Sequence, residues 1–221
     1  MKAFYLVCVL FCNIFVKTQS LKVDYDLIRK TTISSDKQFT KEFSAKIIES
    51  EKKPEKYVLY FVNDDSFFKS IPTEKIEYEN APEIVGGYKK TVVEVAVKIP
   101  VKIYKLKSEN KTYAYTNKEG EEFYKLVPKL NFSSVQYKDD TLKIDNFTCK
   151  LVEVTNTTGS IVKVWYTEDL PISTGPFGYT DFPGVVLKVE TPTFVMYATK
   201  INNDVTTKDI EKMDNKLKKI D

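Results

Sequence analysis

The chain has 221 residues, of which 42% are hydrophobic and 29% charged, and this predicts one soluble globular domain. It contains no histidine, which excludes Ser-His-Asp catalysis, Cys-His catalysis and histidine-containing zinc sites within the chain. The 34 basic and 31 acidic residues nearly balance, so we expect no nucleic-acid partner.

Residues 1–20 have the pattern of a secretory signal peptide. Met1-Lys2 is a short basic start, residues 3–16 are almost all apolar, and residues 17–20 are polar. The apolar run is shorter than the roughly 20 residues that a membrane span needs. We therefore expect an exported protein (periplasmic, outer-membrane associated or secreted) with a single domain over residues 21–221 and no transmembrane span after signal removal.

Cleavage would leave Cys149 as the one remaining cysteine. Phe147, Cys149 and Leu151 alternate with polar residues, which places the sulfur on the apolar face of a strand. We predict a buried thiol without a redox role.

The rest of the chain shows two kinds of hydrophobic periodicity, one typical of strands and one typical of helices. Alternating residues predict strands over 23–27 and 57–62, the second ending in a turn at 63–65, whereas residues 39–53 have the spacing of an amphipathic helix. The longest alternation, over residues 93–103, includes Pro100, which marks an edge or a bulge. Further strands are predicted over residues 113–116, 121–127, 141–144, 147–155, 161–167, 185–190 and 194–201.

The C-terminal segment changes to three- and four-residue spacing. Ile210, Met213, Leu217 and Ile220 form one apolar stripe, which predicts a short helix. Together these patterns predict an α+β fold, with a mainly antiparallel, curved or half-open sheet or barrel of about nine or ten strands and one or two amphipathic helices.

A specialised loop follows the chain's only tryptophan, Trp165. Gly175, Gly178 and Gly184 fall within ten residues, although the whole chain has only seven glycines. Pro183-Gly184 suits the two central positions of a turn, because proline fixes φ and glycine accepts a positive φ.

The segment over residues 149–190 resembles the GLPGLI family, exported proteins of Bacteroidetes-type bacteria. The defining hexapeptide corresponds here to Asp181-Phe182-Pro183-Gly184-Val185-Val186, which keeps only the Pro-Gly pair. The resemblance implies an exported β-structure without an established biochemical activity. In outline this fold is similar to periplasmic carriers that hold acyl chains.

Aromatic residues near this loop suggest a ligand site. The candidate residues are Trp165, Tyr166, Gly175, Pro176, Phe182, Pro183 and Gly184. Our leading hypothesis is a non-catalytic binding or scaffold domain for an apolar or amphipathic, lipid-like ligand, with no cofactor and no metal. For Trp165 itself, we favour a position in the core.

Two alternatives remain open from the sequence. One is an envelope interaction protein that meets a partner protein through the C-terminal helix or the 93–103 edge. The other is a carboxylate-based enzyme acting on carbohydrate through Glu168 or Asp169, although adjacent strand residues point to opposite faces. The acidic pairs at 64–65 and 139–140 do not follow the calcium-loop pattern.

Overall fold

The structure is a computed structural model that describes residues 20–30, 45, 48, 49, 52–72, 76–78, 93–95 and 100–221. The predicted signal peptide lies outside these residues except for Ser20. Ten of the fifteen residues of the helix predicted over residues 39–53 also lie outside them.

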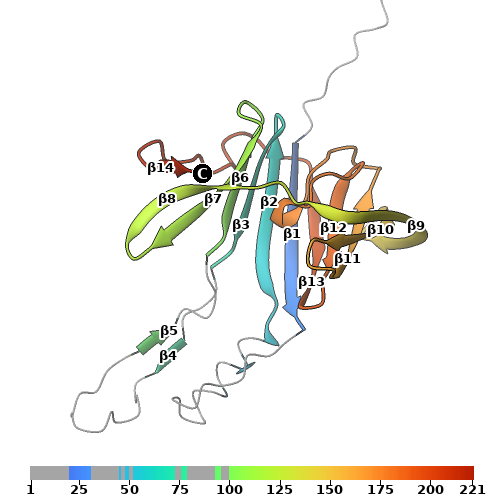
Figure 1. Cartoon of the computed structure of the whole chain (residues 1–221), viewed down its shortest axis with the longest axis horizontal. Coiled ribbons are helices and arrows are strands. Elements are labelled where there is room, and N and C mark those ends of the chain that lie inside the picture. Colours follow the sequence, from blue (N-terminus) through green and yellow to red (C-terminus); the bar gives the residue numbers. More distant parts are fainter. Residues whose placement is uncertain are drawn as a thin grey trace, which may run out of the picture.

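A 12-stranded sheet dominates the described residues, and a two-stranded sheet stands beside it (Figure 1). The strands are β1 (Ser20–Arg29), β2 (Glu55–Val62), β3 (Asp65–Ser70), β4 (Ile76–Tyr78), β5 (Val93–Val95), β6 (Lys102–Leu106), β7 (Lys111–Lys118), β8 (Glu121–Val127), β9 (Phe132–Ile144), β10 (Phe147–Asn156), β11 (Ile161–Thr167), β12 (Val185–Glu190), β13 (Phe194–Asn202) and β14 (Lys218–Ile220). The order in the large sheet is β14-β8-β7-β6-β3-β2-β1-β13-β12-β11-β10-β9. All its pairs are antiparallel except β14 with β8.

The link between β8 and β9 requires this sheet to be strongly curved. β8 and β9 lie near opposite edges, ten strand positions apart, which is about 48 Å in a flat sheet. β8 ends at Val127 and β9 begins at Phe132, and such a link spans at most about 19 Å. Figure 1 shows it crossing from one side of the molecule to the other. The predicted curved antiparallel sheet is therefore confirmed.

Short turns join neighbouring strands where the sequence predicts them. Asn63 and Asp64, between β2 and β3, have φ of 55° and 68°, and Glu119 and Gly120, between β7 and β8, have φ of 56° and 89°. Two consecutive left-handed residues form the tight hairpin turn that matches the twist of the strands, and Asn, Asp and Gly tolerate this conformation best.

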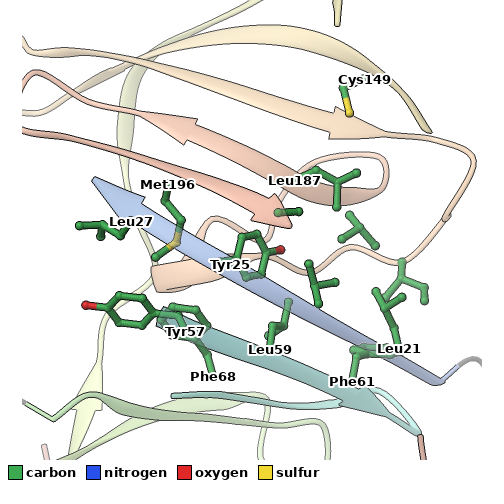
Figure 2. Packing of buried hydrophobic residues seen from close by; sticks show 14 residues of the cluster. Leu21, Tyr25, Leu27, Tyr57, Leu59, Phe61, Phe68, Cys149, Leu187 and Met196 are labelled. Carbon is green, nitrogen blue, oxygen red and sulfur yellow. The ribbon is translucent and has the colours of Figure 1, made fainter. Parts of the chain in front are cut away.

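The central core lies on one face of the sheet. Alternate residues of β1, from Leu21 to Leu27, pack with side chains of β2, β3, β10, β12 and β13 (Figure 2). Tyr25 is completely buried, and its hydroxyl donates a hydrogen bond of 2.6 Å to the carbonyl oxygen of Val186. Cys149 is also completely buried in this core, as predicted, and burial raises the pKa of its thiol to about 11.

Two further cores lie beside this one. The second contains valines of β10, β11 and β12 with Tyr166 and Phe182. The third is aromatic and contains Phe67, Tyr104, Tyr113 and Tyr124. Phe67 and Phe68 are neighbours on β3 and point to opposite faces, so the aromatic core lies behind the face that carries the central core.

The α+β prediction is wrong. The described residues form a nearly all-β fold in which the 3-10 turn η1 (Pro176–Gly178) is the only helix that has defined bounds. None of them forms a helix with the length and apolar character needed to cross a membrane. The alternation over residues 93–103 also does not form one strand in one sheet: β5 pairs with β4, whereas β6 pairs with β3 and β7.

The predicted C-terminal helix is replaced by an irregular segment that ends in β14. Ile210, Met213 and Leu217 pack against the aromatic core. The three apolar side chains are therefore accommodated although the segment is not helical. The amide of Asp214 donates a hydrogen bond of 2.8 Å to the hydroxyl of Tyr124. β14 then pairs with the otherwise free edge of β8, because that edge offers backbone partners which a helix would leave unsatisfied.

Candidate functional site

The segment over residues 168–184 folds back onto the start of β12. The amide of Val186 donates to the carbonyl of Thr174 at 2.9 Å, and the amide of Val185 donates to the carbonyl of Leu170 at 3.2 Å. Gly175 is needed for this close packing, because a Cβ there would lie 2.7 Å from the Cβ of Val186. We refer to residues 168–184 as the folded-back loop.

Phe177, in the middle of the folded-back loop, has an unusual backbone conformation. Its φ of 50° lies in the left-handed region, which a bulky side chain rarely adopts and which costs about 1–2 kcal/mol. Its ring centroid lies 4.9 Å from that of Phe68, 5.4 Å from that of Tyr57 and 5.9 Å from that of Phe194. Packing onto the central core therefore holds the strained residue in place.

A cavity of about 370 Å³ lies between the folded-back loop, the β8–β9 link and the sheet. Its lining is formed by Ser66, Phe68, Ile103, Lys105, Asn110, Lys111, Thr112, Leu126, Val127, Pro128, Lys129, Leu130, Gly175, Phe177, Gly178, Thr180 and Asp181. The volume lies at the lower end of the range of about 300–1,000 Å³ that is typical of small-molecule sites. The lining combines an apolar floor with several lysines, which suits an amphipathic molecule.

An ion pair joins the two covers of the cavity. The Nζ atom of Lys129, in the β8–β9 link, lies 3.1 Å from a carboxylate oxygen of Asp181, in the folded-back loop. Both side chains are substantially exposed. Asp181 therefore gives the folded-back loop a contact with the β8–β9 link.

A second cavity of about 390 Å³ is less suited to a ligand. It lies beside Glu55, Tyr57, Lys102 and Glu211. Its charges already have partners: Lys102 lies 2.5 Å from Glu211, and the Tyr57 hydroxyl donates to Glu55 at 2.8 Å. Because these groups are paired within the chain, few of them remain to bind a charged ligand.

The structure separates the predicted site residues. Gly175 lines the 370 Å³ cavity. Trp165 is half-buried against the central core, beneath the Nζ atom of Lys188 at 5.9 Å from the ring centroid. Its Nε1 atom is buried and has no hydrogen-bond partner in the described part of the chain. Pro176 is buried and Pro183 is exposed.

Tyr166 and Phe182 lie in the second core instead. Their rings stack with centroids 6.2 Å apart, and burial is the main cause of the raised pKa of Tyr166. Gly184 is buried against β11, where a Cβ would lie 1.8 Å from the carbonyl oxygen of Thr167. These three residues anchor the loop, whereas Gly175 also borders the cavity.

The acidic residues considered for catalysis have structural partners. Glu168 forms an ion pair of 2.7 Å with Lys150, and Asp169 accepts a hydrogen bond of 3.3 Å from the amide of Thr148. Asp64 pairs with Lys107. The residues described by the structure contain no group of three acidic or cysteine side chains placed to hold a metal ion.

Most of the cavity's lining could not be recognised from local sequence. Phe68, Ile103 and Leu126 are apolar residues of the kind that any core strand contains. Lys105 alternates with Tyr104 and Leu106, as a solvent-exposed residue of a strand does. The clustered glycines identified the folded-back loop, but the strands opposite it are set by long-range pairing.

The comparisons with known proteins concern mainly the fold. A family model described as "Protein of unknown function (Porph_ging)" matches residues 23–188, which include every residue lining the cavity. The comparison with curated proteins gives no match.

Two solved structures of PNGF-II are similar to the chain. The structure in space group C2 has a TM-score of 0.52 and 14% identity over 91% of this chain, and that in P21 has 0.50 and 15% over 90%. In both cases the match covers 30% of the PNGF-II chain. At such low identity the similarity indicates a shared fold alone.

Proposed function

This chain belongs to the Porph_ging family of proteins of unknown function, and we propose that it is an exported, non-catalytic binding protein for an apolar or amphipathic small molecule. The ligand lies in the cavity between the folded-back loop, the β8–β9 link and strands β3, β6 and β7. The signal-like residues 1–20 and the resemblance to exported GLPGLI proteins support the location.

The observation that carries this proposal is the strained Phe177 at the cavity wall. Residues held at unfavourable backbone angles cluster at binding and active sites, where the surrounding structure enforces them. Phe177 lines the cavity, and its ring lies on Phe68, which also lines it. Together they give an apolar contact surface on a rigid sheet, as small-molecule sites usually have.

The envelope-partner alternative has less support. The C-terminal residues expected to present an amphipathic face, such as Met213 and Leu217, pack against the aromatic core of the same chain. β6, at the end of the predicted 93–103 edge, is paired on both sides. The carbohydrate-enzyme alternative likewise has no supporting geometry, because Glu168 and Asp169 are engaged in local contacts.

Filling the cavity tests the proposal. Thr112 and Thr116 lie on β7 and point to the same face, but only Thr112 lines the cavity. We expect Thr112→Trp to weaken binding of the neutral apolar probe N-phenyl-1-naphthylamine by about tenfold or more, because the indole occupies the space that the probe needs. Thr116→Trp is the matched control and should bind like the unmodified protein.

Probe fluorescence titrations measure the affinity, and urea unfolding checks that each variant is folded. Leu130→Trp, in the β8–β9 link, blocks the cavity from the opposite side if Thr112→Trp is unstable. If the probe fails to bind the unmodified protein, or binds folded blocking variants equally well, the proposed function is wrong.

A further inference from the structure

The cavity contains a lysine that none of the described acidic residues neutralises. Lys105 lies in the middle of β6, opposite Ser66 on β3 and Thr112 on β7, so both of its cross-strand neighbours are uncharged. It lines the cavity and is half-buried. Its ammonium group forms no hydrogen bond or ion pair with any residue that the structure describes.

The nearby lysines behave differently. Lys102, at the start of β6, pairs with Glu211 at 2.5 Å, and Lys107, just after β6, pairs with Asp64. Lys129, across the cavity, pairs with Asp181 at 3.1 Å. Lys111 also lines the cavity without an ion pair to a described residue, but it is exposed at the start of β7. Lys105 is the half-buried lysine of the lining that has no acidic partner among the described residues.

The floor next to Lys105 is apolar. Ile103 lies two residues away on β6 and therefore on the same face, and Phe68 lies opposite Ile103 on β3. An ammonium group beside such a surface is stabilised by an anion, because charge-assisted hydrogen bonds are the stronger ones and partial burial reduces screening by salt. The apolar floor and the unpaired ammonium group of Lys105 together indicate a ligand with one apolar part and one anionic part.

Building on the proposed function, we propose that the ligand is a single-chain amphiphile with an anionic head group. Its hydrocarbon chain lies against Phe68, Ile103 and Phe177, and its head group, a carboxylate or a phosphate, binds the ammonium of Lys105. A cavity of about 370 Å³ is near the lower limit for ligand sites, which favours one chain over the two of a bilayer lipid.

Matched ligands that differ only in the head group test this assignment. Dodecanoate, dodecyl phosphate and dodecanol are each used to displace N-phenyl-1-naphthylamine from the full chain, below their micelle-forming concentrations. We expect both anions to bind at least about tenfold more tightly than dodecanol, the ratio that a charge-assisted hydrogen bond provides. A difference between the two anions identifies the head group.

Three variants connect the preference to Lys105. Lys105→Met keeps the length of the side chain but removes its charge, and should reduce the preference for anions to less than about threefold while dodecanol affinity is kept. Lys105→Arg should retain the preference. Lys118→Met, at the exposed end of β7 away from the cavity, makes the same charge change and should have no effect.

The outcomes separate this inference from the proposed function. If dodecanol displaces the probe as well as the anions do, or if Lys105→Met keeps the full preference, the anionic head group is refuted and the apolar site stands. If none of the three ligands displaces a probe that the blocking variants exclude, the single-chain amphiphile is refuted and the apolar site stands.

Discussion

Replacing Gly184 by alanine tests whether the folded-back loop is held by direct contact between backbones. An added Cβ at Gly184 would lie 1.8 Å from the carbonyl oxygen of Thr167 and 2.7 Å from its carbonyl carbon. Ordinary contact begins near 3.4 Å, so the two segments must separate by about 1.6 Å. Thr167 is completely buried at the end of β11, and its backbone cannot rotate away as a side chain could.

The expected loss is therefore large. Overpacking in a core typically costs about 1–3 kcal/mol, and here both partners are backbone, so we expect Gly184→Ala to lower the free energy of unfolding by at least about 3 kcal/mol. Gly159→Ala is the matched control. Gly159 lies in an open turn at φ +85° with nothing within 4 Å of an added Cβ, so its replacement should cost only about 1–2 kcal/mol of backbone strain.

Urea unfolding followed by the fluorescence of Trp165 measures both variants, since this single tryptophan lies two residues before Thr167. An unchanged denaturant slope shows that the same surface unfolds in each case. If Gly184→Ala is no less stable than Gly159→Ala, the close backbone approach is wrong and the loop lies further from β11 than described.

Two further predictions concern the central core. Tyr25→Phe removes the hydroxyl that donates to the Val186 carbonyl at 2.6 Å in a completely buried position, and should lower the free energy of unfolding by about 1–2 kcal/mol in urea unfolding. Tyr197→Phe, on β13 and not part of that contact, should change it by less than about 0.5 kcal/mol. Burial raises the pKa of the Cys149 thiol to about 11, so it stays protonated and unreactive toward a disulfide reagent at pH 8. Rapid labelling of the folded protein at that pH would contradict the buried placement.

The turns could be predicted because their signals are local. The turn after residue 62 and the turn between the strands over 113–116 and 121–127 follow from their residues, and the structure has turns at both. The burial of Cys149 followed from the alternation of its own strand in the same way. These inferences need only a few neighbouring residues. The alternation does not predict β3, which follows Asn63-Asp64.

Among the elements that the alternation does not predict, the first half of β9 and the C-terminal β14 have an environment that is set by distant strands. β9 begins at Phe132, although the alternation predicted a strand only over residues 141–144. It is the edge strand, and Val135 and Tyr137 are exposed, so the inward-outward contrast that marks a strand is weak there. The C-terminal stripe has helical spacing, but the aromatic core and the free edge of β8 provide better partners than a helix would have.

The same long-range pairing explains why a cavity exists. A large curved sheet has to cover both of its faces, and Ile210, Met213 and Leu217 cover the aromatic face over β3, β6, β7 and β8. On the opposite face, the folded-back loop packs onto β12 from one side while the β8–β9 link crosses from the other. The two covers meet through the Lys129–Asp181 ion pair, and Phe68, Ile103 and Lys105 line the cavity that remains between the covers and the sheet. This cavity depends on the curvature of the whole sheet and on both covers, so local sequence does not predict it and ligand binding has to test it.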